Sequence, residues 1–306
     1  MVEELPRYLR VLYPFKSNYL PVKGGQMHYV DEGEGPVVIM LHGNPTWSFY
    51  YRNLVFALKD RYRCIVPDHI GCGFSDKPRD FSYQLKDHID NVLTLIAHLG
   101  IKKFHLVVHD WGGAIGMGAA QYHPENVGKM VITNTAAFRS SIIPWQLRFC
   151  RIPFLAKFFI QGLNGFALPA TRMAVVKKMP REVRDGYLFP YRSWGNRRAT
   201  YRFVQDIPMK PNHESYETLT RLEENMESLS DKKVGIFWGG KDFVFTKAFY
   251  EVWKKYFPKA ESRYFEKYGH YLLEDGKDAI IEQIEAFLDS EVKPESASVR
   301  EGQIVL

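Results

Sequence analysis

The chain has 306 residues, 45% of them hydrophobic and 25% charged, and a formal net charge of +6. This length and apolar content allow a large buried core, which excludes disordered and fibrous proteins. No apolar signal core opens the sequence and no apolar run is long enough to span a membrane, which predicts a cytoplasmic protein. The three cysteines, Cys64, Cys72 and Cys150, are too scattered to indicate a disulfide framework or a C-x-x-C metal site.

The first half of the sequence alternates strand and helix patterns. Gly24 and Gly25 lie between two short extended runs, which predicts a β-hairpin. The apolar run at 37–43 predicts a strand that is covered on both faces. The elements that follow are, in chain order, a helix that ends near residue 58, a strand at 63–70, a helix at 85–99, a strand at 104–109, a helix at 112–123 and a strand at 129–133.

The alternation lapses between 139 and 210, where helical and aromatic sequence is broken by prolines. This segment is predicted to be a helical cap, inserted over the carboxyl ends of the strands. It carries 14 Lys and Arg against 3 Asp and Glu, a balance of +11, whereas the rest of the chain has 27 basic and 32 acidic residues. The basic cap favours an anionic partner, a membrane surface, self-association or docking of a partner enzyme, and the remaining interpretation is a solvated face.

The strand and helix alternation resumes after the cap. Strands are predicted at 234–240 and 262–268, and a last helix at 277–288. Strands that alternate with helices predict an α/β protein with a mostly parallel sheet, in which the first hairpin forms an antiparallel edge. The predicted domain organisation is a core of 1–138 and 211–290, the cap of 139–210 and a polar C-terminal tail of 291–306.

Four polar residues follow predicted strands, at the edge where parallel α/β sheets bind ligands: Asn44, Asp110, Asp242 and His270. Asp110 lies in FHLVVHDWGGAIG, a strand that breaks into small residues and continues as a helix, which is the setting of a sharp nucleophile turn. The chain order of a nucleophile, an acid and a histidine is the one expected of α/β-hydrolases. The pattern therefore predicts a catalytic set of Asp110, Asp242 and His270.

Five motifs make the sequence similar to the haloalkane dehalogenase family of α/β-hydrolases: HGNPTWSFYYR, PDHIGCGFSDKP, VVHDWGGAIG, WGGKDFVF and YGHYLLED. The resemblance implies an α/β-hydrolase fold, with an eight-stranded, mostly parallel sheet flanked by helices and an inserted helical cap. It also implies that Asp110 is the nucleophile, His270 the base and Asp242 the acid that orients it. Asn44 and Trp111 correspond to the pair that binds the halide.

The chemistry of these residue types agrees with the implied roles. A carboxylate is already ionised at neutral pH, so Asp110 can attack an sp³ carbon without losing a proton first. A departing halide needs N–H donors, which the amide of Asn44 and the indole of Trp111 provide. Neutral His270 can then activate water toward the ester on Asp110, while the backbone N–H groups of Asn44 and Trp111 hold the oxyanion.

Neighbouring residues could also supply the acid or bind a metal or a nucleotide. Some family members place the acid after the preceding strand, but that position here is Asn134, an amide that cannot balance an imidazolium charge. Asp275 and Glu274 are the weaker competitors of Asp242. No metal and no cofactor are expected, because His42 and His109 lack a ligand spacing and the string GCGFSD lacks the third glycine of a dinucleotide loop.

The leading hypothesis is hydrolytic dehalogenation of a haloalkane to an alcohol. The alternative is a β-lactone decarboxylase of long-chain olefin biosynthesis, a sister group that the sequence also resembles and that shares the same site residues. Epoxide hydrolysis needs phenols from the cap, for which Tyr187, Tyr191 and Tyr201 are present. It ranks below both, because an indole beside an amide suits a halide better. A hydrolase fold kept only for ligand binding ranks last, because a binding protein has no use for a full catalytic set.

A small apolar molecule is the expected substrate in each catalytic case, and no nucleic-acid partner is expected. The candidates to line the pocket are Phe138, Phe149, Phe154, Phe166, Leu168, Phe203 and Phe245.

Overall fold

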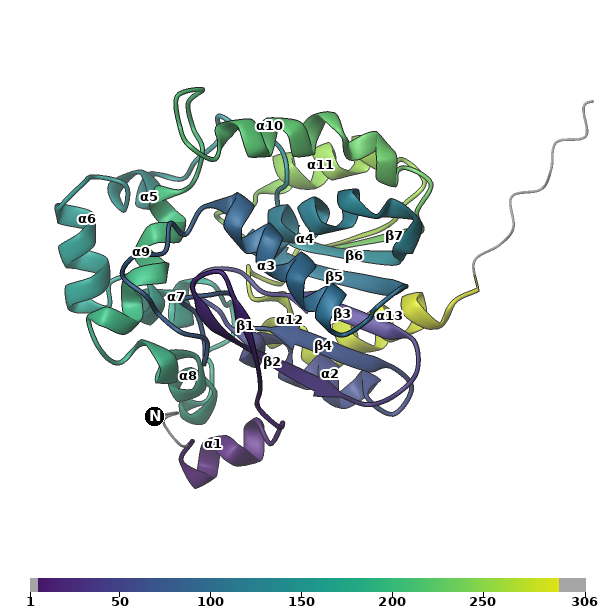
Figure 1. The fold of residues 1–306 in the computed structure, drawn as a ribbon, viewed down its shortest axis with the longest axis horizontal. Helices are drawn as coiled ribbons and strands as arrows, with labels where there is room; N and C mark the ends of the chain where they lie inside the picture. Colours follow the sequence, from purple (N-terminus) through teal and green to yellow (C-terminus); the bar gives the residue numbers. More distant parts are fainter. Residues whose placement is uncertain (1–4, 292–306) are drawn as a thin grey trace, which may run out of the picture.

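The computed structural model describes residues 5–291, and the predicted tail beyond residue 291 lies outside them. Within these residues the strands form one eight-stranded sheet in the order β1-β2-β4-β3-β5-β6-β7-β8 (Figure 1). The strands are β1 (Asn18–Val22), β2 (Gly25–Glu32), β3 (Val37–Leu41), β4 (Arg63–Pro67), β5 (Phe104–Asp110), β6 (Val127–Thr135), β7 (Val234–Gly239) and β8 (Glu261–Phe265).

The sheet is parallel except around β2, which runs antiparallel to both β1 and β4. The hairpin of β1 and β2 therefore forms an antiparallel edge, and the predicted eight-stranded, mostly parallel sheet is confirmed. The central strands β3, β5 and β6 are buried along almost their whole length. Their continuous apolar sequences are the expected consequence, because helices cover both faces of a parallel sheet.

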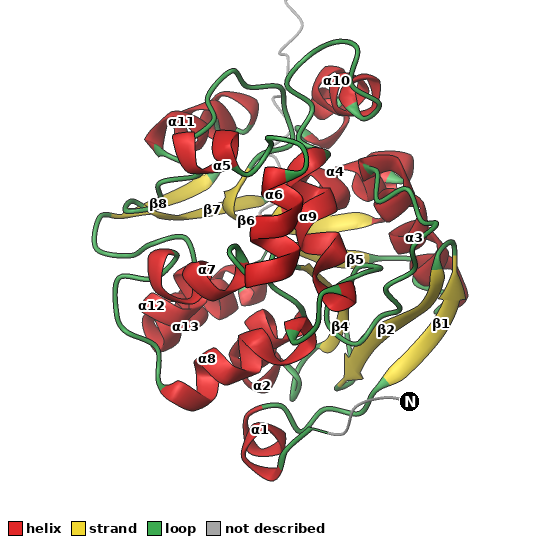
Figure 2. Ribbon diagram, turned by 90° about the vertical axis from the view of Figure 1, so that its left-hand side faces the viewer, coloured by secondary structure: helices red, strands yellow, loops and turns green. Residues whose placement is uncertain are grey.

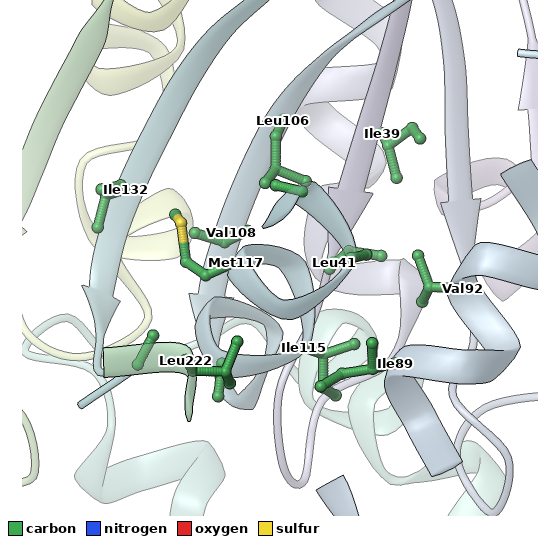
Figure 3. Close-up of a cluster of buried hydrophobic side chains, with 14 of the residues drawn as sticks. Ile39, Leu41, Ile89, Val92, Leu106, Val108, Ile115, Met117, Ile132 and Leu222 are labelled. Atoms are coloured by element: carbon green, nitrogen blue, oxygen red, sulfur yellow. The ribbon is translucent and has the colours of Figure 1, made fainter. Parts of the chain in front are cut away.

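Helices cover the sheet in two layers, as Figures 1 and 2 show. One layer contains α3 (Leu85–His98), α4 (Trp111–Tyr122), α10 (Tyr216–Glu224) and α11 (Lys247–Tyr256), and the other contains α2 (Arg52–Leu58), α12 (Leu272–Asp275) and α13 (Lys277–Asp289). In the first layer, Ile115 and Met117 of α4 lie against Leu41, Leu106 and Val108 of the strands (Figure 3). None of the helices within residues 5–291 has both the length and the apolar character needed to cross a bilayer.

The segment 139–210, called the cap below, contains five α-helices within the described part of the chain. They are α5 (Trp145–Phe149), α6 (Leu155–Lys157), α7 (Ala167–Met173), α8 (Arg181–Leu188) and α9 (Arg198–Gln205). These helices lie together beyond one end of the sheet, next to the turn that joins β5 to α4 (Figure 1). A short helix α1 (Arg7–Leu12) contacts α8 from outside.

A buried ion pair ties the cap to the body. Arg52, at the start of α2, donates from its two terminal nitrogens to the carboxylate of Glu274 on α12, at 2.5 and 3.0 Å. The hydroxyl of Tyr187, on cap helix α8, donates to the same carboxylate at 2.5 Å. The Arg52 guanidinium also lies 4.1 Å from the ring centroid of Phe49. One carboxylate thus joins three helices.

Replacing Arg52 by methionine should strongly destabilise the protein, because Glu274 would keep a buried charge without its partner. The expected loss in the free energy of unfolding is about 3–5 kcal/mol, measured by urea denaturation. The double variant Arg52→Met/Glu274→Gln should recover most of that loss. Arg61→Met is the control, since Arg61 pairs with Glu285 and Asp289 at an exposed site. A loss no larger than that of Arg61→Met would contradict the assignment.

Candidate active site

The turn between β5 and α4 presents Asp110 at its apex. Asp110 has φ 51° and ψ −128°, a left-handed conformation that side chains rarely adopt. The helix can begin this close to the sheet because two glycines follow. A Cβ atom on Gly112 would overlap the carbonyl oxygen of Leu41, and one on Gly113 would overlap the hydroxyl of Thr135. The same hydroxyl donates to the carbonyl oxygen of Asp110 and fixes the strained turn.

The two carboxylate oxygens of Asp110 have different surroundings. Oδ1 accepts the backbone N–H of Asn44 at 2.6 Å, and the backbone N–H of Trp111 also donates to the carboxylate. Oδ2 lies 3.8 Å from Nε2 of His270. Burial raises the pKa of Asp110, while the charge of His270 and the two N–H donors act in the opposite direction. If Oδ2 attacked a substrate, Oδ1 would become the ester carbonyl oxygen and would already accept the N–H of Asn44.

His270 is held between two carboxylates. Its Nδ1 lies 2.7 Å from Oδ2 of Asp242, so the Nδ1 hydrogen is donated there and Nε2 faces Asp110. The ring stacks on Phe245, with centroids 5.7 Å apart. Burial acts to lower the pKa of His270, but the charge and hydrogen bond of Asp242 and the charge of Asp110 outweigh it, so the pKa is raised. The structure thus brings together Asp110, Asp242 and His270, the three residues predicted to form one catalytic set.

Asn134 takes part in the site as a support for Asp242. Its Nδ2 donates to Oδ2 of Asp242 and to the carbonyl oxygen of Gly239, both at 3.0 Å. Its Oδ1 accepts the N–H of Gly239 at 2.8 Å. The other oxygen of Asp242 accepts the N–H of Val244 at 2.7 Å. The amide that cannot serve as the acid therefore fixes the loop that carries the acid.

Asn44 and Trp111 both line the cavity above Asp110. Nδ2 of Asn44 donates at 3.1 Å to the carbonyl oxygen of Thr200 on cap helix α9, which leaves the second hydrogen of this amide for a leaving group. The indole of Trp111 packs against Phe203, with ring centroids 5.3 Å apart. The cap thus orients both of the predicted N–H donors.

The competing acids have other roles. Glu274 belongs to the ion pair with Arg52. The buried carboxylate of Asp275 accepts the backbone N–H groups of Gly269, Val176 and Lys177 at 2.7 to 3.0 Å. Asp275 therefore joins the loop before His270 to the cap. Sequence reasoning missed this support, because its partners are backbone groups that leave no pattern in the sequence.

The histidines beside the site also support the backbone. His109 lies with Nε2 2.9 Å from the carbonyl oxygen of His270. His42 accepts the N–H of His69 at Nε2, at 3.1 Å, and its Nδ1 lies 2.8 Å from the carbonyl oxygen of Gly43. In the part of the chain that the structure describes, no group of three His, Cys, Asp or Glu side chains could hold a metal ion.

An apolar cavity of about 540 Å³ lies between the body and the cap, with Asn44, Asp110, Trp111 and His270 in its wall. Of the predicted lining residues, four are in the wall: Phe138, Phe149, Phe166 and Phe245. The other three predictions were wrong. The side chains of Phe154 and Leu168 are exposed to solvent, and Phe203 is buried between Trp111 and His88. Whether a cap side chain faces the cavity, the solvent or another residue depends on how its short helix is oriented.

Comparison with known proteins places the chain in a family. Residues 36–277 match the α/β hydrolase fold family, and the chain belongs to it. Over 287 residues it is 44% identical to the Cis-3-alkyl-4-alkyloxetan-2-one decarboxylase of Shewanella oneidensis, covering 92% of this chain and 90% of that one. It is 34% identical over 238 residues to a haloalkane dehalogenase of Mycolicibacterium paratuberculosis, covering 69% and 74%.

Solved structures lead to the same family. The haloalkane dehalogenase DbeA from Bradyrhizobium elkani superimposes with a TM-score of 0.81 and 25% sequence identity, covering 90% of this chain and 97% of that one. The motifs indicate a resemblance to haloalkane dehalogenases and to β-lactone decarboxylases, and the comparisons confirm both resemblances.

Replacing Asp242 by asparagine should lower the pKa of His270. The wild-type ring keeps its second proton to a higher pH than an ordinary histidine, chiefly because Asp242 outweighs the effect of burial. Without that charge the ring should lose the proton at a lower pH, measured by NMR titration of the imidazole. Asp275→Asn is the control, because Asp275 bonds to the backbone. Equal shifts in the two variants would contradict the pairing of Asp242 with His270.

Proposed function

We propose that this protein decarboxylates a β-lactone that carries an alkyl group on each of two ring carbons, with Asp110 as the nucleophile. The observation that carries the proposal is a buried carboxylate, with one oxygen held by the backbone N–H of Asn44, in the wall of a large apolar cavity. The relative from Shewanella oneidensis, named for this reaction, is 44% identical over 92% of the chain, against 34% over 69% for the dehalogenase of Mycolicibacterium paratuberculosis. For this reason we rank the lactone ahead of the haloalkane that the sequence hypothesis favoured.

The cavity wall suits two alkyl groups. Part of it comes from the body, where Leu219 of α10 and Phe249 of α11 lie, and part from the cap, where Phe166 and Met173 lie. Both parts are apolar, so each can bury hydrocarbon. The polar atoms of Asp110 and its donors are then left to the four-membered ring.

The first step opens the lactone ring. Oδ2 of Asp110 attacks the sp³ ring carbon that is bonded to the ring oxygen, not the carbonyl carbon, and the bond between that sp³ carbon and the ring oxygen breaks. The electron pair stays on the departing oxygen, so an ester forms on Asp110 and a carboxylate is released within the substrate. An anion in an apolar cavity needs hydrogen bonds. The side-chain N–H groups of Asn44 and Trp111 are the donors that can supply them.

The second step releases the products. The bond between the carboxylate carbon and its neighbour breaks, and its electron pair forms the carbon–carbon double bond. The ester bond to Asp110 breaks at the same time, which returns the aspartate as a carboxylate and yields an alkene and carbon dioxide. This route consumes no water, and no proton is transferred. The water-activating role of His270 is therefore not required for it.

Dehalogenation remains the second candidate because of that histidine. Nε2 of His270 lies 3.8 Å from Oδ2 of Asp110, and Asp242 orients the ring. This arrangement suits a water molecule that attacks the ester carbonyl and gives its proton to Nε2, with the oxyanion on Oδ1 held by the N–H of Asn44. Attack on a haloalkane would form the ester and release halide, and this hydrolysis would release the alcohol.

Epoxide hydrolysis has weaker support, because the phenols predicted for it have other partners. Tyr187 donates to Glu274, and Tyr191 donates at 3.2 Å to the carbonyl oxygen of Thr46. The third, Tyr201, packs at the edge of a small cluster inside the cap.

The purified protein should convert a cis-dialkyl β-lactone to equal amounts of alkene and carbon dioxide, measured by gas chromatography. Asp110→Ala should abolish the reaction, because no other group forms the ester. Asp275→Asn, which keeps the nucleophile, should retain part of it. Halide release from 1-bromoalkanes without conversion of the lactone would contradict the proposal in favour of the second candidate.

Replacing His270 by phenylalanine should separate the two reactions. The variant lacks a base to activate water, so a bromoalkane should leave a stable alkyl ester on Asp110, seen as a gain in intact mass. The lactone should still be turned over repeatedly, since its route uses no water. His109→Phe is the control that keeps the base. A single lactone turnover followed by a trapped adduct would rule out the proposed elimination step.

A further inference from the structure

The outer surface of the cap is unusually apolar. Twelve of the sixteen exposed large apolar side chains in residues 5–291 belong to the cap. Phe154 is 88% exposed and Trp145 is 74% exposed, and Leu155, Phe158 and Leu163 are mostly exposed as well. They lie on or beside α5 and α6, which face the viewer in Figure 2. A soluble protein rarely exposes so many large apolar side chains in one region without a binding role.

The same surface is basic. Residues 140–180 contain six Lys and Arg and no Asp or Glu. Arg148 and Lys157 are exposed beside the apolar side chains. Arg151 instead has a structural role, because its guanidinium donates to the carbonyl oxygens of Val204 and Ile207. The exposed surface therefore combines large apolar groups with positive charge.

The catalytic cavity reaches this surface. Trp145, Phe149, Ile142 and Met173 line the cavity, and each is also at least 40% exposed to solvent. A side chain that does both lies at an opening. The entrance to the cavity is therefore lined by exposed apolar side chains of 142–173, the segment that also carries the exposed Arg148 and Lys157.

We propose that the cap surface formed by 142–173 docks onto the surface of an anionic lipid bilayer. Aromatic and aliphatic side chains can insert at the level of the headgroups, while Arg148 and Lys157 lie near lipid phosphates. An apolar substrate dissolved in the bilayer then meets the cavity entrance directly. A second copy of the chain fits this surface less well, because two such caps would face each other with like charge. Lipid binding does not depend on which reaction the site performs.

Sedimentation with lipid vesicles tests the proposal on the full chain. Wild type should bind vesicles of phosphatidylcholine mixed with phosphatidylglycerol, bind phosphatidylcholine alone much more weakly, and lose binding as salt is raised. Arg148→Glu/Lys157→Glu should weaken binding at least about 25-fold, at about fivefold for each basic side chain. Phe154→Ser/Phe158→Ser should weaken it about tenfold or more.

Matched variants at the other end of the molecule are the controls. Lys102→Glu/Lys103→Glu changes two exposed basic residues just before β5, and Tyr122→Ser removes an exposed aromatic at the end of α4. These variants should bind vesicles like wild type. All the variants should retain turnover of a short, water-soluble substrate, which also reports that they fold.

The proposal is overturned if wild type fails to bind the anionic vesicles, or if the control variants lose binding as much as the cap variants do. It is also overturned if wild type is a dimer that ignores vesicles and that Phe154→Ser/Phe158→Ser converts to a monomer. That result would assign the surface to a second copy.

Discussion

Burying the carboxylate of Asp110 beside an apolar cavity costs free energy, because a charged group loses its hydration there. The backbone N–H groups of Asn44 and Trp111 and the facing ring of His270 offset that cost. The left-handed turn at Asp110 directs the carboxylate toward the loop after β3, and it can approach the N–H of Asn44 because Gly43 carries no Cβ atom, which would overlap Oδ1. The sharp turn, the small residues and the position at a strand end all follow from the need to stabilise one buried anion.

The backbone N–H that bonds the free carboxylate of Asp110 is also in position to stabilise negative charge on the same oxygen during a reaction. Oδ1 of Asp110 accepts the backbone N–H of Asn44 before any reaction, so an ester at Oδ2 keeps its carbonyl oxygen on that donor without rearrangement. The fate of such an ester then depends on the substituent next to it. In the proposed reactions, a neighbouring carboxylate would leave as carbon dioxide, whereas a plain alkyl ester would need water activated by His270. One site can therefore serve elimination or hydrolysis, and the substrate decides between them.

Much of this site could be predicted from the sequence, because the ends of parallel strands converge. Asp110, Asp242 and His270 each follow a strand with a clear apolar pattern, and the order of strands in an α/β sheet brings them together. Asp275 could not be assigned a role in this way, since its partners are backbone N–H groups from the cap and the His270 loop. The wrong position predicted for Phe154 has a related cause. Helix α6 has three residues, too few for a periodic pattern to predict its buried face.

One side of the cap is hydrogen-bonded to the body and the other side is exposed to solvent. The bonded side also contacts a residue of the active site. Tyr187 and the backbone at 176–177 bind carboxylates of α12, while the carbonyl oxygen of Thr200 holds the amide of Asn44. A shift of α9 would therefore move the amide that is proposed to hold the leaving group. The exposed helices are tied to α9 as well, because Ala156 of α6 packs in one buried cluster with Val204 of α9, and Arg151, just after α5, donates to the carbonyl oxygen of Val204. Contacts at the outer surface can therefore reach Asn44 through α9.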